Sequence, residues 1–336
     1  MRNRYPVGAH GDPSQWARSP AWCRRMFLGA LAVCATTSAA CRQLETANEY
    51  DQVRLSPGGA GPRVLCVVAH PDDEIAFAGA LYKTASHLDG RCDVAVLTNG
   101  EGGYKYSTLA ERVYGLELTR EAVGRAHLPA IRARELEAGC RVLGVSRIFF
   151  LGQTDHRYTT DVEEVLGADA DVWELERVER VLDEILTAGE YDVVLTLAPT
   201  DGTHGHHKAA TLLALRAAAR RPESDRPAVL AARSRAEGEP APTLTPLAGY
   251  AESELSGLEF EFDRTQAFGY RERLNYKVVA NWAIAEHKSQ GTMQLAMNGT
   301  DREHYFLFAG GPPDARARCE AWFGALAEPQ FEPLEY

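Results

Sequence analysis

The chain has 336 residues, of which 45% are hydrophobic and 25% charged, and its formal net charge at pH 7 is −11. These values are ordinary for one globular α/β domain with appendages, and the length is ample for a large buried core. A nucleic-acid-binding protein normally presents a basic face, so the acidic balance argues against nucleic acid as a partner.

The N-terminal segment 1–40 has the pattern of an export signal rather than of a folded element. A pair of arginines, Arg24 and Arg25, precedes the apolar and small-residue run 27–40, which is too short for a permanent membrane span. This order is similar to that of a twin-arginine signal peptide, and the Ala-Ala-Cys that ends at Cys41 resembles a lipoprotein cleavage site. We therefore expect export to the periplasm or cell envelope, with lipidated Cys41 as the membrane attachment. The alternative is a disordered cytoplasmic extension with a chance arginine pair.

Residues 41–62 are rich in Gly, Pro, Asn and Ser and predict a linker. The four cysteines after Cys41 are scattered, which favours neither a disulfide framework nor a cysteine-based zinc site. The remaining stretch, 63–330, carries no internal repeat, and we expect it to form a single domain.

Apolar strands and amphipathic helices alternate through this domain. Buried strands are predicted at 64–68, 93–98, 147–151 and 192–198. Helices are predicted at 76–87, 130–143, 172–188 and 271–294. Such alternation, with polar residues gathered after the strands, is typical of a Rossmann-like, doubly wound and mostly parallel α/β sheet.

Three further segments do not fit this alternation. Residues 220–248 are rich in Arg, Ala, Glu and Pro and predict a surface insertion with little core. Residues 258–262 alternate apolar and acidic side chains, which predicts an edge or antiparallel strand. Residues 104–129 carry tyrosines and arginines without a clean period, and we interpret them as an active-site loop or lid.

Polar residues that are able to do chemistry follow three of the predicted strands. The run 70–74 (His-Pro-Asp-Asp-Glu) follows the first, Asp155 follows the third, and the run 203–207 (Thr-His-Gly-His-His) follows the fourth. Because strand ends meet at one edge of a sheet, we expect these groups to lie close together. A nucleotide-binding Rossmann protein would instead carry a glycine fingerprint after its first strand, so that class is rejected.

Two histidines and one carboxylate are a common catalytic zinc set, and iron(II) fits the same ligands. A second carboxylate beside a ligating one can act as a general base toward water. A further histidine can polarise a carbonyl or protonate a leaving amine. The combination predicts amide hydrolysis, whereas the alternative interpretation of residues 72–74 is a solvated turn or a helix cap.

Residues 69–74 (Ala-His-Pro-Asp-Asp-Glu) resemble the signature of the PIG-L / LmbE-like zinc de-N-acetylase family. Other segments are similar to the family's pattern and stand in the same order: 98–103, 134–145, 151–155, Lys277 and 287–290. The resemblance implies an LmbE-like fold. It also implies metal binding by His70, Asp73 and His207, with Asp72 as the base that activates water.

The family usually has His-Pro-Asp-His where this chain has residues 204–207. His204 takes the place of the first histidine, and the resemblance implies that it polarises the acetyl carbonyl or stabilises the oxyanion. Gly205 and His206 depart from the pattern, so His206 stays open as an alternative to His207 as the ligand. The departure also removes a carboxylate that could orient a ligand histidine. We expect Glu74 to cap the following helix rather than to bind metal.

The function that the resemblance implies is removal of an N-acetyl group from a glycan, glycolipid or glycoconjugate that contains an amino sugar. We also predict substrate contacts from Arg112, Asp155 and His287, and sugar stacking within 104–125. Two alternatives stay open: hydrolysis of another amide or acyl conjugate, and a non-catalytic exported lipoprotein that binds sugar or metal. The sequence does not predict an oligomeric state.

Overall fold

A computed structural model describes residues 50–330 of the chain. The predicted export signal, 1–40, and the predicted lipidation site at Cys41 lie outside the described residues. Within 50–330, the structure contains no helix whose length and apolar character would let it cross a membrane.

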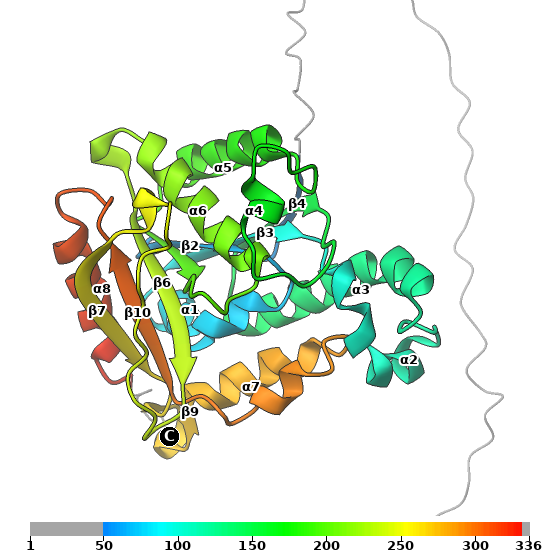
Figure 1. The fold of residues 1–336 in the computed structure, drawn as a ribbon. Coiled ribbons are helices and arrows are strands. Elements are labelled where there is room, and N and C mark those ends of the chain that lie inside the picture. The colour runs from blue at the N-terminus through cyan, green and yellow to red at the C-terminus, as the bar shows by residue number, and fades with distance from the viewer. Residues whose placement is uncertain (1–49, 331–336) are drawn as a thin grey trace, which may run out of the picture. The chain divides into compact units, whose positions relative to one another are not determined.

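An eight-stranded mixed sheet forms the middle of the domain (Figure 1). Its spatial order is β1 (Asp51–Arg54), β4 (Arg147–Gln153), β3 (Arg91–Thr98), β2 (Arg63–Val68), β5 (Val193–Leu197), β6 (Ala228–Arg235), β10 (Arg302–Phe308) and β7 (Leu255–Asp263). The five central strands, β4, β3, β2, β5 and β6, pair with one another in parallel. β1 pairs antiparallel with β4, and β10 pairs antiparallel with both β6 and β7. The α/β, doubly wound and mostly parallel sheet predicted from the sequence is therefore confirmed.

Helices cover both faces of this sheet (Figure 1). One face packs against α1 (Ala78–His87), α3 (Glu121–Leu143), α7 (Tyr276–Glu286) and α8 (Ala315–Ala327). The other face packs against α4 (Glu163–Leu166), α5 (Leu175–Gly189) and α6 (Gly205–Arg220). Because β2 lies between two helical layers, its side chains alternate between the two cores, and its residues 64–68 are all apolar.

The remaining elements are short. They are η2 (Asp73–Phe77), η3 (Glu101–Tyr106), α2 (Thr108–Tyr114), η4 (Glu223–Asp225), η5 (Ala251–Ser253), η6 (Tyr270–Glu272), η7 (Met293–Ala296), and a two-stranded pair of β8 (Ala267–Phe268) and β9 (Leu274–Asn275).

Two segments that we expected to lie outside the core belong to the sheet. Within the predicted linker 41–62, residues 51–54 form β1, a mostly exposed edge strand whose short sequence has little apolar pattern. Within the predicted insertion 220–248, residues 228–235 form β6, which lies between β5 and β10 with its first five residues buried. The charged and proline-rich flanks of β6 hide this apolar run when composition is averaged over the whole segment.

The prediction of a loop at 104–129 is also wrong in part, because this segment contains the end of η3, all of α2 and the start of α3. Its apolar side chains pack into a small cluster of their own, so they do not follow the period of the main core. The predicted strand 258–262 is confirmed as part of β7 at the sheet edge. The predicted helix 271–294 is shorter, since α7 ends at Glu286.

Candidate metal centre

The candidate site lies at the carboxyl ends of β2 and β5. The chain runs from β2 outward through β3 and β4 and then crosses to β5 on the other side of β2, so the strand order reverses between β2 and β5. Open α/β sheets bind ligands in the crevice at such a switch point. The loop after β2 and the first turn of α6 both face this crevice.

The loop after β2 is closed by one of its own side chains. Asp73 Oδ2 accepts hydrogen bonds from the backbone N–H groups of Ala69, at 3.1 Å, and His70, at 2.8 Å. The carboxylate is thereby fixed beside the His70 ring, and the chain between them places Asp72 at the head of η2.

His70, Asp73 and His207 form a first cluster. His70 Nδ1 lies 2.9 Å from His207 Nε2 and 3.7 Å from Asp73 Oδ2. His207 Nε2 lies 3.3 Å from Asp73 Oδ1. The three groups offer two imidazole nitrogens and a carboxylate within 4.8 Å of one another, a donor set that suits zinc or iron(II).

A second cluster lies on the opposite side of the His70 ring. His70 Nε2 lies 3.2 Å from His206 Nδ1 and 3.9 Å from Asp155 Oδ1. His206 is fully buried, and its Nδ1 lies 3.5 Å from Asp155 Oδ1. The structure thus brings both candidate histidines to His70, with His207 on the side of Asp73 and His206 on the side of Asp155.

Carboxylates in the crevice shift the pKa values of their neighbours. Burial and the neighbouring Asp73 raise the pKa of Asp72 to about 6, although Arg132 and His287 act in the opposite direction. Burial favours the neutral ring of His70, but its bond with Asp73 and the charge of Asp155 outweigh this and raise its pKa to about 9. The carboxylates therefore favour positive charge at this point, and a divalent cation would supply it.

His204 caps α6. Its Nδ1 accepts a hydrogen bond from the His206 N–H at 3.1 Å. Burial, together with the charges of His70 and His207, lowers the pKa of His204 to about 3. A neutral imidazole that accepts at Nδ1 carries its proton on Nε2, so His204 can donate a hydrogen bond to a substrate oxygen.

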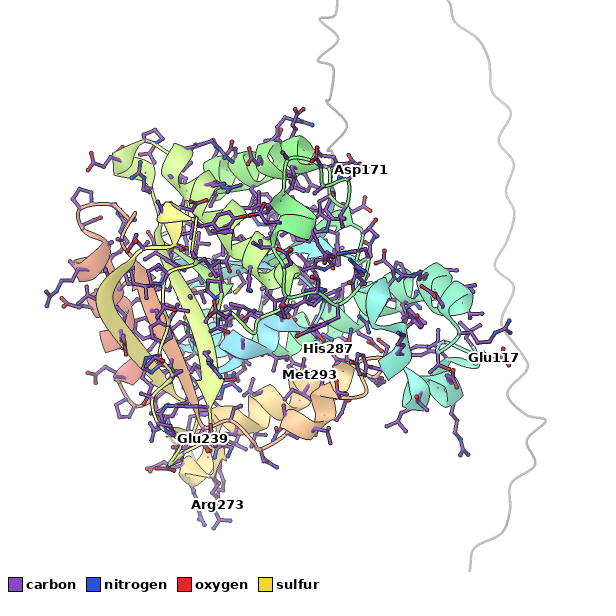
Figure 2. The ribbon with its side chains drawn as sticks, in the orientation of Figure 1. Glu117, Asp171, Glu239, Arg273, His287 and Met293 are labelled. Carbon is purple, nitrogen blue, oxygen red and sulfur yellow. The ribbon has the colours of Figure 1, made fainter. Side chains whose placement is uncertain are left out.

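The prediction that Glu74 caps a helix is wrong. Glu74 and His287 are fully buried, and Glu74 Oε1 lies 2.6 Å from His287 Nε2. The pair joins η2 to the end of α7, where His287 is labelled in Figure 2. This burial also contradicts the predicted substrate contact of His287, which supports the Asp72 loop from within the protein.

The other two predicted substrate contacts differ from each other. Asp155 is in the crevice, where its Oδ2 accepts a hydrogen bond from the Gly102 N–H at 3.1 Å. Arg112 is exposed on α2 and is not among the residues that the two clusters bring together.

Three residues near the crevice were missed. Arg132 is buried on α3, where it donates a hydrogen bond to the carbonyl of Gly100 and lowers the pKa of Asp72. An arginine inside an amphipathic helix gives no sequence signal of such a role. His156 lies next to His206, and its place directly after Asp155 was a usable signal. Tyr158 is exposed, and its ring centroid lies 5.0 Å from that of His204.

A groove of about 460 Å³ opens beside His207. It is lined by the ends of β5 and β6 and includes Thr200, Thr203, Arg233 and Ser234. These hydroxyl and guanidinium groups give the groove a polar wall next to the first cluster.

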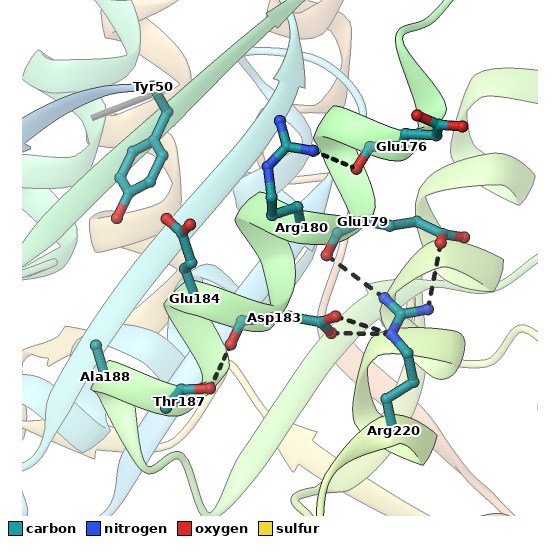
Figure 3. Close-up of a pocket in the computed structure, with 9 residues that line it drawn as sticks. All are labelled: Tyr50, Glu176, Glu179, Arg180, Asp183, Glu184, Thr187, Ala188 and Arg220. Carbon is teal, nitrogen blue, oxygen red and sulfur yellow. Dashed lines mark hydrogen bonds and ion pairs between the residues drawn. The ribbon is translucent and has the colours of Figure 1, made fainter. Parts of the chain in front are cut away.

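A larger groove of about 740 Å³ runs along α5, and Figure 3 shows its charged lining. Arg220 there pairs with Asp183 at 2.9 Å and with Glu179 at 3.5 Å. None of the residues that line this groove belongs to either cluster. The strand-end crevice, not this groove, combines side chains that could hold a metal with a candidate base.

Comparison with known proteins gives one family and several relatives. Residues 65–218 match the family described as "PIG-L: GlcNAc-PI de-N-acetylase". A "Probable N-acetyl-alpha-D-glucosaminyl L-malate deacetylase 2" from Bacillus cereus is 27% identical over 167 residues, which cover 49% of this chain and 65% of that protein. A "1D-myo-inositol 2-acetamido-2-deoxy-alpha-D-glucopyranoside deacetylase" from Corynebacterium urealyticum is 31% identical over 157 residues, 44% of each chain. The matched stretch is thus less than two thirds of either relative.

Among solved structures, the zinc-inhibited form of teicoplanin deacetylase Orf2 aligns with a TM-score of 0.45 and 18% identity, covering 74% of this chain and 98% of that one.

Proposed function

We propose that this chain is a metal-dependent N-deacetylase that acts on an amino-sugar-containing substrate, starting from the match of residues 65–218 to the PIG-L family of de-N-acetylases. The observation that carries the proposal is the convergence of His70, Asp73 and His207, with the Asp72 carboxyl beside them. Pure binding needs no second acid next to a ligand, so Asp72 favours catalysis over a non-catalytic sugar- or metal-binding role.

His70 Nδ1, an Asp73 oxygen and His207 Nε2 are the groups that would hold the metal, and zinc is the ion we propose. When bound, such an ion supplies a Lewis acid for the acetamide carbonyl and makes water easier to deprotonate. With three protein ligands, such a site would keep a coordination position for water or substrate.

Asp72 and His204 would carry out the proton and charge chemistry. The Asp72 carboxylate takes a proton from the attacking water, and its pKa of about 6 leaves most of it ionised at pH 7. His204 donates its Nε2–H to the oxygen that gains negative charge. Asp72 then passes the proton to the amine nitrogen as the C–N bond breaks, and acetate and a free amine leave.

The proposed substrate is an N-acetylated sugar within a glycan, glycolipid or other conjugate. Both curated relatives have names that describe acetylated glucosamine compounds, which supports this class. The polar groove beside His207 gives room for the part of the substrate beyond the acetamide, and the exposed Tyr158 ring beside His204 gives a sugar ring a face to stack on.

We also propose that the chain is exported and attached to the cell envelope through lipidated Cys41, so that its substrate is extracytoplasmic. The support is the sequence order of paired arginines, apolar run and Ala-Ala-Cys. Mass spectrometry of the protein from its native host tests this, since an unprocessed N-terminus would contradict both export and lipidation.

Acetate release from a panel of N-acetyl amino sugars and their conjugates tests the proposed reaction. We expect release from at least one amino-sugar compound, and a chelator should stop it. Release only from other amides would favour the alternative acyl conjugates. A metal-loaded chain that binds a sugar of the panel but releases no acetate would favour the non-catalytic alternative. Acetate release at an unchanged rate in the presence of the chelator would refute the proposed metal dependence.

A further inference from the structure

Three imidazoles form a row that begins at His70. His70 Nε2 lies 3.2 Å from His206 Nδ1, and His206 Nε2 lies 2.8 Å from His156 Nδ1. At the far end, His156 Nε2 lies 3.2 Å from Glu164 Oε2. The row therefore joins a proposed metal ligand to a carboxylate on α4 through two other side chains.

The proton positions in this row follow from the metal site proposed above, on which the present inference rests. His70 faces Asp73 and His207 with Nδ1, so that nitrogen carries no proton when it binds a metal. The ring proton is then on Nε2 and points to His206 Nδ1. The same reasoning places the proton of each following ring on Nε2, and all three N–H groups point toward Glu164.

Glu164, the acceptor at the end of the row, also accepts hydrogen bonds from two other side chains. Arg157 Nη2 donates to its Oε2 at 2.9 Å, and Thr159 Oγ1 donates to its Oε1 at 2.9 Å. Hydrogen bonds from His156, Thr159 and Arg157 lower the pKa of Glu164 to about 2. The end of the row therefore carries a negative charge at neutral pH.

The middle of the row has little freedom to move. His206 is fully buried, and the Trp173 ring packs 5.2 Å from it, centroid to centroid. Gly205 donates its N–H to the carbonyl of Thr159 at 2.7 Å, which ties the start of α6 to the segment that carries His156 and Glu164. Packing thus holds His206 where both of its nitrogens have a partner.

We propose that His206 is a positioning residue for His70 and that it connects His70, through His156, to the negative charge of Glu164. Partners of this kind fix the tautomer and orientation of a metal-binding histidine and make its ligating nitrogen more basic. Asp155 is the rival acceptor, but its Oδ1 is 3.9 Å from His70 Nε2, longer than the 3.2 Å to His206.

Zinc affinity of the full chain, measured by competition with a chromophoric chelator, tests this role. His206→Ala removes the acceptor, and loss of such a partner weakens metal binding by about 10- to 100-fold. His206→Asn keeps an amide group near the position of Nδ1 and should recover part of that loss. Glu164→Gln removes only the distant charge and should cause a smaller loss.

Two controls separate this row from general damage. Glu163→Gln makes the same charge change one residue away. The Glu163 carboxylate accepts a hydrogen bond from the Tyr250 hydroxyl and is not part of the row, so this variant should leave zinc affinity unchanged. In a His206→Ala background, Glu164→Gln should have no further effect, because the row is already cut. Equal and additive losses in the two backgrounds would contradict a connection through His206.

Nitrogen NMR of the zinc-loaded wild-type chain gives a test that needs no variant. We expect His70, His206 and His156 all to carry their proton on Nε2, and a proton on Nδ1 of His206 would overturn the assignment. If wild-type chain binds one zinc and His206→Ala binds it as tightly, this inference is wrong while the proposed function stands. If the wild type takes up no zinc, the proposed metal site is wrong, and this inference is wrong with it.

Discussion

Asp72 is surrounded by groups that act on its charge in opposite directions. Burial and Asp73 favour its neutral form, whereas Arg132, His287 and His70 favour the carboxylate. A general base is most effective when its pKa lies near the working pH, because it is then ionised and still able to hold a proton. The balance around Asp72 places its pKa at about 6, near neutral pH.

Asp72→Asn should therefore separate catalysis from metal binding. Loss of a general base commonly costs about 10²- to 10⁴-fold in rate, so we expect kcat to fall by that order while zinc content stays near one per chain. Steady-state kinetics and metal analysis on the same preparation measure the two quantities. Asp73→Asn is the matched control and should lose metal as well as activity, whereas wild-type turnover by Asp72→Asn would refute the assignment of the base.

At the scale of elements, a buried ion pair between Arg264 and Glu303 supports the helical turn that follows Asp72. Glu303 on β10 accepts hydrogen bonds from the N–H groups of Gly79, at 2.7 Å, and Ala80, at 3.1 Å, at the start of α1. Arg264 donates to Glu303 Oε1 at 2.6 Å and to the carbonyl of Ile75 in η2 at 2.6 Å. The antiparallel edge of the sheet thereby holds the helical turn that follows the site.

Arg264→Met should be strongly destabilising, because it leaves the Glu303 carboxylate buried without its charged partner. Breaking a buried pair in this way costs about 3–5 kcal/mol, and urea unfolding measures the change in the free energy of unfolding. The exposed pair Arg316–Glu320 on α8 is the control, and Arg316→Met should leave that free energy nearly unchanged. Equal effects of the two substitutions would contradict the supporting role of Arg264.

Gly205 and Gly324 are both in helices, but substitution should affect them in opposite ways. A Cβ at Gly205 would lie 2.5 Å from the carbonyl oxygen of Asp161, whereas one at Gly324 would meet nothing within 4 Å. Gly205→Ala should therefore lower the free energy of unfolding, and Gly324→Ala should raise it by about 0.5–1 kcal/mol. Urea unfolding of both variants checks the prediction, which fails if the two shifts have the same sign.

How much of these elements the sequence predicts depends on how each one is buried. Strands β2 to β5 are buried on both faces, so their apolar runs were recognisable from the sequence. The strand β1 is exposed and β6 is flanked by charged residues, so local composition concealed both of them. Polar residues after strand ends predicted that the runs 70–74 and 203–207 lie close together, and the resemblance to the PIG-L / LmbE-like family singled out His70, Asp73 and His207 among them.

The missed parts depend on contacts between distant segments. Glu74 and His287 are 213 residues apart, and no local pattern indicates that they form a buried pair. His206 was visible only as a departure from a familiar motif, and its partners on the segment after β4 become evident in three dimensions. Long-range pairing of polar side chains is what single-sequence periodicity does not contain.

At the scale of the whole molecule, the reversal of strand order between β2 and β5 makes the crevice, and the loops after β2, β4 and β5 fill it with acids and imidazoles. Helical layers cover both faces of this sheet. The proposed reaction needs a cation at the point where His70, Asp73 and His207 meet.

Titration of the metal-stripped chain with zinc, followed by acetate release from the substrate of the panel that it cleaves, tests this claim most directly. We expect no acetate without metal, and a rate that rises in proportion to zinc until one equivalent per chain is bound. Full acetate release by the stripped chain, or none at one equivalent of bound zinc, would contradict a metal-dependent deacetylase.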